Sequence, residues 1–183
     1  MNGRLAAAVS LLAGCALFSK SEPLDIRYYA PPAVPSESRD DGSATKVRLG
    51  DVSSGSHLRS RIAYRASPTE IELYEERRWT EPPHEYARRA LEQELVARGV
   101  LVTGGKALEL EVEVVGFEIV EVPVPAGRVA LRYLLIDDRT VVREDVVEVV
   151  RPGRADFDSL VTAIGGALEE ASERVVAEAM RTQ

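Results

Sequence analysis

Apolar residues alternate with charged ones in three stretches between residues 46 and 75, and this period of two predicts β-strands. Ser67-Pro68 is typical of a turn between the second and third stretches, so these two strands are expected to form a hairpin with one solvated face. The alternating apolar positions are Val47, Leu49, Leu58, Ile62, Tyr64, Ile71 and Leu73.

A second group of three strands is predicted between residues 108 and 150. In the first of them the apolar residues alternate with the glutamates of Glu109–Glu113, and the apolar phase then shifts around Gly116. Such a shift indicates a β-bulge or a sharp bend. The glutamates are most simply a solvated strand face, although they could instead pair across strands with Arg61 and Arg65.

Two segments carry apolar residues at helical spacing. The first helix is expected to begin after Trp79, with Thr80 as its N-cap and prolines in its first turn. Gly99 is placed to be the left-handed residue that ends this helix. Asp156 is the candidate N-cap of the second helix, whose apolar residues between 160 and 175 line one face.

The predicted order of elements is three strands, a helix, three strands and a helix (βββ-α-βββ-α). Short hairpin connections make the sheet mainly antiparallel, with about six strands, and both helices are free to cover one of its faces. The predicted fold class is therefore α+β, in the form of a two-layer sandwich.

The N-terminal segment differs from the rest of the chain in its hydrophobic pattern. Arg4 is followed by the apolar stretch Leu5–Leu12, which only Ser10 interrupts, and then by Ala13, Gly14 and Cys15. This order predicts a secretory signal peptide that is cleaved between Gly14 and Cys15. The tetrapeptide Leu-Ala-Gly-Cys resembles the bacterial lipobox.

Cys15 is the only cysteine of the 183 residues, and the lipobox resemblance makes it the lipidation site. Its thiolate is nucleophilic enough to accept diacylglycerol, and the amine that cleavage exposes is then expected to carry an acyl chain such as palmitate. No other cofactor is expected. The alternatives are a plain signal peptide with a bystander cysteine, or a transmembrane helix, for which the apolar stretch is too short.

Charge and composition limit the partners and the number of domains. Removing residues 1–14 takes away Arg4 and no acid, which changes the net charge from −7 to −8. An acidic protein argues against nucleic acid as a partner, because phosphate binding needs concentrated Lys and Arg. We expect a signal peptide at 1–14, a lipidated N-terminus at 15–45 and a single α+β domain at 46–183.

The segment 15–45 is expected to hold a short edge strand at Ile26–Tyr29 and then a flexible tether. Ala30–Ala44 is rich in Pro, Ser and Asp, and it buries too little apolar area to order itself. About 15 flexible residues span roughly 20 Å, which would give the domain reach from the membrane.

No group of residues has the spacing of a catalytic or metal site. His57 and His84 are the only histidines, so a metal site lacks a cluster of ligands. Ser53-Ser54-Gly55 lies near His57, but it is not a nucleophile elbow. Gly104-Gly105-Lys106 fails the spacing of a phosphate-binding loop, and Ala107 stands in place of its Ser or Thr. We therefore expect a protein that is not an enzyme.

Trp79 is the only tryptophan, and two interpretations of it remain open. It is most simply a partly buried core ring beneath the first helix. Alternatively, it is an aromatic anchor at a protein interface, since tryptophan is enriched among the residues that dominate binding energy.

Several strings in the right order make the mature chain similar to the ABC-type transport auxiliary lipoproteins, a family that includes the lipoprotein of the paraquat-inducible intermembrane transport operon. The most specific of these strings surrounds Arg78-Trp79-Thr80-Glu81-Pro82. After the lipobox the strings are Tyr28-Tyr29-Ala30-Pro31, Val47-Arg48-Leu49-Gly50-Asp51-Val52, Arg61-Ile62-Ala63-Tyr64-Arg65 and Leu73-Tyr74-Glu75-Glu76-Arg77-Arg78-Trp79-Thr80-Glu81-Pro82-Pro83.

The resemblance implies a non-catalytic accessory subunit of an ABC lipid transport system of the mammalian-cell-entry (MCE) type. Its partner would be the MCE-domain protein that spans the periplasm. Whether the subunit also forms a homo-oligomer is left open by the resemblance. Ala16 follows Cys15 where an aspartate would retain the protein, so the resemblance places it on the periplasmic face of the outer membrane. The alternatives are an assembly lipoprotein that binds other envelope proteins and an anchored hydrolase.

Overall fold

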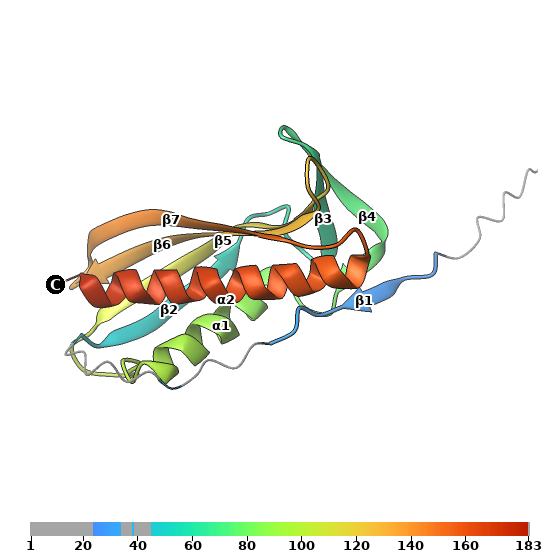
Figure 1. The fold of residues 1–183 in the computed structure, drawn as a ribbon. Helices are drawn as coiled ribbons and strands as arrows, with labels where there is room; N and C mark the ends of the chain where they lie inside the picture. The colour runs from blue at the N-terminus through green and yellow to red at the C-terminus, as the bar shows by residue number, and fades with distance from the viewer. Residues whose placement is uncertain (1–23, 34–37, 39–44, 183) are drawn as a thin grey trace, which may run out of the picture.

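The computed structural model describes residues 24–33, 38 and 45–182. Within them, six strands and two helices follow the predicted βββ-α-βββ-α order, and one short strand, β1, precedes them (Figure 1). In chain order they are β1 Arg27–Tyr29, β2 Val47–Ser54, β3 Arg61–Ser67, β4 Glu70–Trp79, α1 Pro83–Ala97, β5 Leu108–Val120, β6 Ala126–Asp137, β7 Thr140–Pro152 and α2 Phe157–Arg181.

All the strands of this described part join one sheet, in the order β1-β4-β3-β5-β6-β7, with β2 also paired to β5. The long pairings β3–β4, β5–β6 and β6–β7 are antiparallel hairpins. The shorter pairings β1–β4, β2–β5 and β3–β5 are parallel. Because the long pairings dominate, the predicted mainly antiparallel sheet is confirmed.

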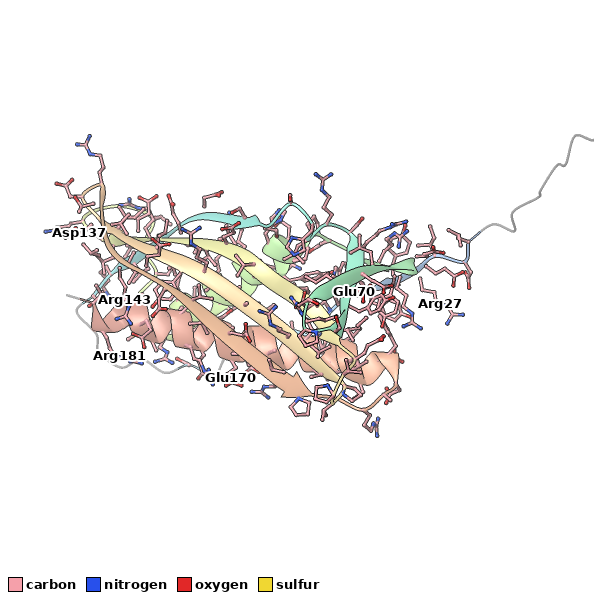
Figure 2. All side chains as sticks on the ribbon, turned by 90° about the horizontal axis from the view of Figure 1, so that it is seen from above. Arg27, Glu70, Asp137, Arg143, Glu170 and Arg181 are labelled. Atoms are coloured by element: carbon pink, nitrogen blue, oxygen red, sulfur yellow. The ribbon has the colours of Figure 1, made fainter. Side chains whose placement is uncertain are left out.

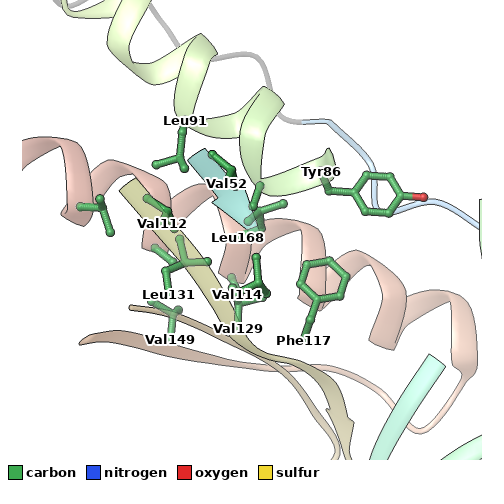
Figure 3. Close-up of a cluster of buried hydrophobic side chains, with 14 of the residues drawn as sticks. Val52, Tyr86, Leu91, Val112, Val114, Phe117, Val129, Leu131, Val149 and Leu168 are labelled. Atoms are coloured by element: carbon green, nitrogen blue, oxygen red, sulfur yellow. The ribbon is translucent and has the colours of Figure 1, made fainter. Parts of the chain in front are cut away.

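Both helices cover the same face of the sheet, so the α+β two-layer sandwich is also confirmed (Figure 1). α2 lies along β6 and β7, and α1 lies beside it over β2 and β5. The core between the layers is a single cluster of apolar side chains, in which residues of β5 and β6 meet residues of both helices (Figure 3). With only one cysteine in the chain, this burial is the main source of stability.

The helix ends follow the sequence with one exception. Asp156 caps α2, because its side chain accepts a hydrogen bond from the Ser159 backbone N–H. Gly99 has φ +66° after α1, as predicted. The prediction that Thr80 caps α1 is wrong. Pro82 occupies the N-cap position without a side-chain bond, and the Thr80 hydroxyl bonds the Tyr86 hydroxyl at 2.6 Å instead.

The predicted irregularity at Gly116 is confirmed. The register of β5 against β6 shifts between Val114 and Gly116, which is the signature of a β-bulge. A Cβ atom on Gly116 would lie 2.7 Å from Nη1 of Arg128. The glycine therefore leaves the space that the Arg128 side chain fills.

Gly127 gives a direct test of the contact between the two layers. A Cβ atom there would lie 2.7 Å from the backbone carbon of Ala163 in α2, so Gly127→Ala should force β6 and α2 apart. We expect the free energy of unfolding in urea to fall by about 1–3 kcal/mol, the usual cost of overpacking. Gly104→Ala is the matched control, since a Cβ atom there meets nothing within 4 Å. Equal effects of the two variants would contradict this description of the interface.

Candidate functional site

The predicted lipidation site, Gly14 and Cys15, lies outside the residues that the structure describes. Lipidation of Cys15 and cleavage after Gly14 therefore stay predictions. The same holds for most of the predicted tether. Its first residues, Ala30–Ala33, are described, and they follow directly on β1, which already belongs to the sheet.

Trp79 is a core residue with only 1% of its surface exposed. Its ring packs edge-on against Phe117 at 5.2 Å between centroids and against Tyr86 at 6.2 Å. Figure 3 labels Phe117 of β5 and Tyr86 of α1 among the buried side chains of this cluster. A partner could touch Trp79 only after these side chains had moved, so its predicted role at an interface gains no support from this geometry.

The structure does bring one histidine close to a serine and a carboxylate. The Ser54 hydroxyl lies 3.2 Å from Nδ1 of His84, and Nε2 of His84 lies 3.6 Å from Glu85 Oε1. His57, in contrast, is exposed in the β2–β3 loop. Of the two histidines, His84 is therefore the one at which the anchored-hydrolase hypothesis can be tested against the structure.

This arrangement lacks two parts of a hydrolytic triad. The His84–Glu85 distance is longer than a hydrogen bond, so the carboxylate does not hold the imidazole in one tautomer. The backbone N–H of Gly55, which follows the serine and would be an oxyanion donor, donates instead to the Val114 carbonyl at 3.0 Å. The geometry thus favours a polar contact between β2 and the start of α1.

The loop Gly104-Gly105-Lys106 does not have the form of a phosphate-binding loop, and the described residues hold no cluster of metal ligands. Gly105 has φ +81° in an irregular loop, and its carbonyl accepts a bond from Arg48 at 2.9 Å. No helix starts after this loop, so no row of N–H groups points at a phosphate. Within the described ranges, no three His, Cys, Asp or Glu residues are grouped as metal ligands would be.

A buried ion-pair network occupies the open face of the sheet at the bulge. Glu118 is 1% exposed, and its Oε1 accepts bonds from Arg65 at 2.7 Å and from Arg128 at 2.6 Å. Arg128 also bonds Glu148 on β7. Burial by itself lowers the pKa of Arg128, but the hydrogen bonds and the negative charges of these two carboxylates outweigh it and raise this pKa. The network joins β3, β5, β6 and β7 and fixes their register at this point.

A second polar cluster ties the β3–β4 hairpin to the turn after β5. The rings of Tyr64 and Tyr74 lie 4.4 Å apart. The Tyr64 hydroxyl donates to Glu72, which raises the pKa of Tyr64 to about 12. Burial and a hydrogen bond to Glu121 raise the pKa of Tyr74. Both phenols stay protonated at neutral pH and act as donors that hold the hairpin in place.

One concave feature of the surface is a groove between α1 and α2, with a cavity of about 250 Å³. We call it the helix groove. Apolar and small side chains form much of its wall, and the Glu81–Arg89 ion pair, 2.5 Å long, stands beside it. Its lining includes Pro31, Pro32, Tyr86, Ala90, Gly165, Leu168 and Ser172.

Two details show that the helix groove is shaped by specific residues. A Cβ atom on Gly165 would lie 2.9 Å from the Pro32 carbonyl oxygen, so this glycine lets the chain after β1 cross α2 closely. Ser172, 1% exposed, lines the same groove, and its hydroxyl has no hydrogen-bond partner among the described residues. A buried donor without a partner is costly and calls for an explanation such as a bound group.

Solved structures share this fold at low sequence identity. A protein from Xanthomonas campestris superposes with a TM-score of 0.74 at 20% identity, and the match covers 85% of this chain and 96% of that one. An uncharacterised protein superposes with a TM-score of 0.66 at 18% identity, with coverage of 82% and 96%. These likenesses show the fold alone. No curated protein sequence matches this chain.

The sequence profile of the ABC-type transport auxiliary lipoprotein component family matches residues 29–176. The match begins at the last residue of β1 and ends within α2, so it includes α1, most of α2 and the body of the sheet. Neither helix of the described part is long and apolar enough to cross a bilayer. The match spans most of the chain, and this protein therefore belongs to the ABC-type transport auxiliary lipoprotein component family.

Proposed function

We propose that this protein is a non-catalytic accessory subunit of an MCE-type ABC lipid transport system. It is anchored to the outer membrane through lipidated Cys15 and docks the component that spans the periplasm. The observation that carries the proposal is the family match over residues 29–176. The family description connects the protein with an ABC transporter. That its partner is an MCE-domain protein and that its membrane is the outer membrane are inferred in addition.

The helix groove is the docking site in this proposal. Its cavity of about 250 Å³ is smaller than the roughly 300–1,000 Å³ of pockets that hold drug-sized ligands. A pocket of this size suits one large side chain of a partner, because interface hot spots are single anchors in well-packed pockets. A partner side chain with one polar atom would also satisfy the Ser172 hydroxyl.

Docking agrees with the chemistry of the rest of the domain. The Ser54–His84 contact lacks a free oxyanion donor, and the titratable groups around Glu118 and Tyr64 form ion pairs and hydrogen bonds between strands. These side chains hold strands together, so they support a domain whose surface binds proteins. An assembly lipoprotein that binds other envelope proteins is the alternative, and it would use the same surface.

Photocrosslinking from two surface positions tests this proposal in cells. We expect a photoreactive side chain at Gln93, which lines the helix groove, to capture the MCE-domain protein, identified by mass spectrometry. The same side chain at Val146 of β7, which is 51% exposed, is the matched control. Ala90→Phe fills the groove and should reduce the Gln93 crosslink severalfold without lowering the melting temperature.

The outcomes separate the two functions. Capture of the MCE-domain protein from Gln93 and not from Val146 supports docking at the groove. Equal capture from both positions would keep the partner but move the interface elsewhere. Capture of only other envelope proteins, by an intact and lipidated bait, would overturn the transport role in favour of the assembly role.

A further inference from the structure

Three large apolar side chains stand exposed at alternate positions just before and within β1. Leu24 is 52% exposed, Ile26 41% and Tyr28 65%. Side chains of an extended chain alternate between two sides, and Tyr29, the next residue, turns to the domain and packs on Phe157 at 4.5 Å between ring centroids. Tyr28 and the two residues in phase with it therefore point away from the core.

This surface lies where the chain arrives from the predicted lipid anchor. Only eight residues separate Cys15 from Leu24, so even a fully extended chain would place Leu24 at most about 30 Å from the lipidated cysteine. Pairing of β1 with β4 fixes the following residues to the sheet. The end of the domain that carries β1 is thus held close to the membrane.

We propose that Leu24, Ile26 and Tyr28 form a membrane-seating surface, whose side chains enter the boundary between headgroups and acyl chains beside the anchor. The inference rests on the lipid anchor of the proposed function. Transfer of the leucine and isoleucine side chains out of water is favourable in free energy, and the amphipathic ring of tyrosine suits the membrane–water interface. A lipid anchor of two or more chains needs no help to bind, so the effect of this surface is on orientation.

Cations near the surface fit phospholipid headgroups. The Arg27 side chain is 69% exposed, with a 3.5 Å contact to Asp25, and Arg154, just before α2, is 86% exposed beside Asp156. Arginines at a membrane surface are attracted to phosphate groups and anionic lipids. Each of these arginines can keep its protein partner and still offer free N–H groups, since the guanidinium carries five donors.

Seating this surface on the membrane sets the direction of the whole domain. In Figure 2 the labelled residues Arg27 and Asp137 lie at opposite ends of the molecule. With β1 against the lipid, the β6–β7 hairpin around Asp137 and the C-terminal end of α2 point away from it (Figure 1). The sheet and both helices would then stand out from the membrane toward the periplasm-spanning partner.

An environment-sensitive fluorophore on a single introduced cysteine tests the proposal, because lipidation uses the only native thiol. The full lipidated chain is reconstituted into vesicles of phosphatidylethanolamine with a minority of phosphatidylglycerol, and labelled at Ile26→Cys. Val142→Cys, near the opposite end and similarly exposed at 47%, is the control. We expect a blue-shifted emission at position 26 and severalfold stronger quenching by nitroxide-labelled acyl chains than at position 142.

A second variant distinguishes insertion of these side chains into the membrane from a position that is only close to the lipid anchor. With the label at Leu24→Cys, the double change Ile26→Ser and Tyr28→Ser should restore quenching by aqueous iodide severalfold while the protein still floats with the vesicles. Equal iodide quenching at positions 26 and 142 in a floating protein would overturn the seating surface and leave docking untouched. If the protein did not float with the vesicles, the lipid anchor on which the seating surface rests would be missing, and the proposal would be overturned. The crosslink from Gln93 tests docking independently of this result.

Discussion

Trp79→Ala is expected to lower the free energy of unfolding by about 3–5 kcal/mol, the usual cost of deleting a large buried aromatic side chain. The ring is 1% exposed and packs edge-on against Phe117 and Tyr86, so its removal leaves a cavity between sheet and helix that the surroundings can only partly fill. Urea unfolding and thermal melting measure the loss, which should shift the melting temperature by about 10 °C or more.

Tyr28→Ala is the matched control for this prediction. It also removes an aromatic side chain, but from a position that is 65% exposed, so the free energy of unfolding should change by less than about 0.5 kcal/mol. If Trp79→Ala melted at the wild-type temperature and only weakened partner binding, the core assignment would be wrong. That result would favour the interpretation of Trp79 as an aromatic anchor at a protein interface.

Cys15→Ser is expected to abolish lipidation and to release the protein from the membrane. Serine has nearly the same size, but its hydroxyl is a far weaker nucleophile than a thiolate and does not accept the diacylglycerol. No second cysteine can take over, because Cys15 is the only one. Metabolic labelling with a fatty-acid analogue and fractionation of membranes measure both effects.

Ser19→Ala, four residues beyond the predicted lipidation site, is the control and should keep the label and the membrane attachment. Uptake of label by Cys15→Ser would show that the lipid is attached elsewhere. Loss of label with the protein still in the membrane fraction would show a second mode of attachment, such as an uncleaved signal segment.

Local features of the fold could be predicted because their cause lies within a few residues. The shift of apolar phase at Gly116, the Asp156 cap and the left-handed Gly99 were all visible in the sequence. Thr80 does not cap α1, because another residue occupies the N-cap position and the threonine hydroxyl has a different partner. Pro82 already has the extended backbone of an N-cap, and the Tyr86 hydroxyl takes the threonine side chain.

Long-range pairings could not be predicted, since no local signal fixes which strand lies beside which. The glutamates of Glu109–Glu113, in the first half of β5, were expected to face Arg61 and Arg65 if they paired at all. Instead, Glu109 contacts Arg48 on β2 at 3.7 Å and Glu113 contacts Arg132 on β6 at 3.5 Å. The reason is topological, because β3 meets β5 only at residues 118–120.

The network at Glu118 did have a signal that sequence reasoning missed. A single glutamate stands in the apolar run Val114–Val120, and a charge in such a run is expected to be buried with partners. The helix groove had no such signal. It depends on Pro32 meeting Gly165, two residues whose closeness exists only once the sheet and both helices are assembled.

The pairing of β1 with β4 decides where mechanical load from the membrane would enter the domain. The two strands run in parallel, with Arg27, Tyr28 and Tyr29 beside Arg77, Arg78 and Trp79, so a pull on the chain before β1 acts along the strand and strains its hydrogen bonds together, in shear. The force passes to β4, which is paired with β3 and leads into α1. If Cys15 carries the proposed lipid anchor, a docked partner that pulls against it would load the β1–β4 pairing before the hairpins β5–β6 and β6–β7, which lie farther along the sheet.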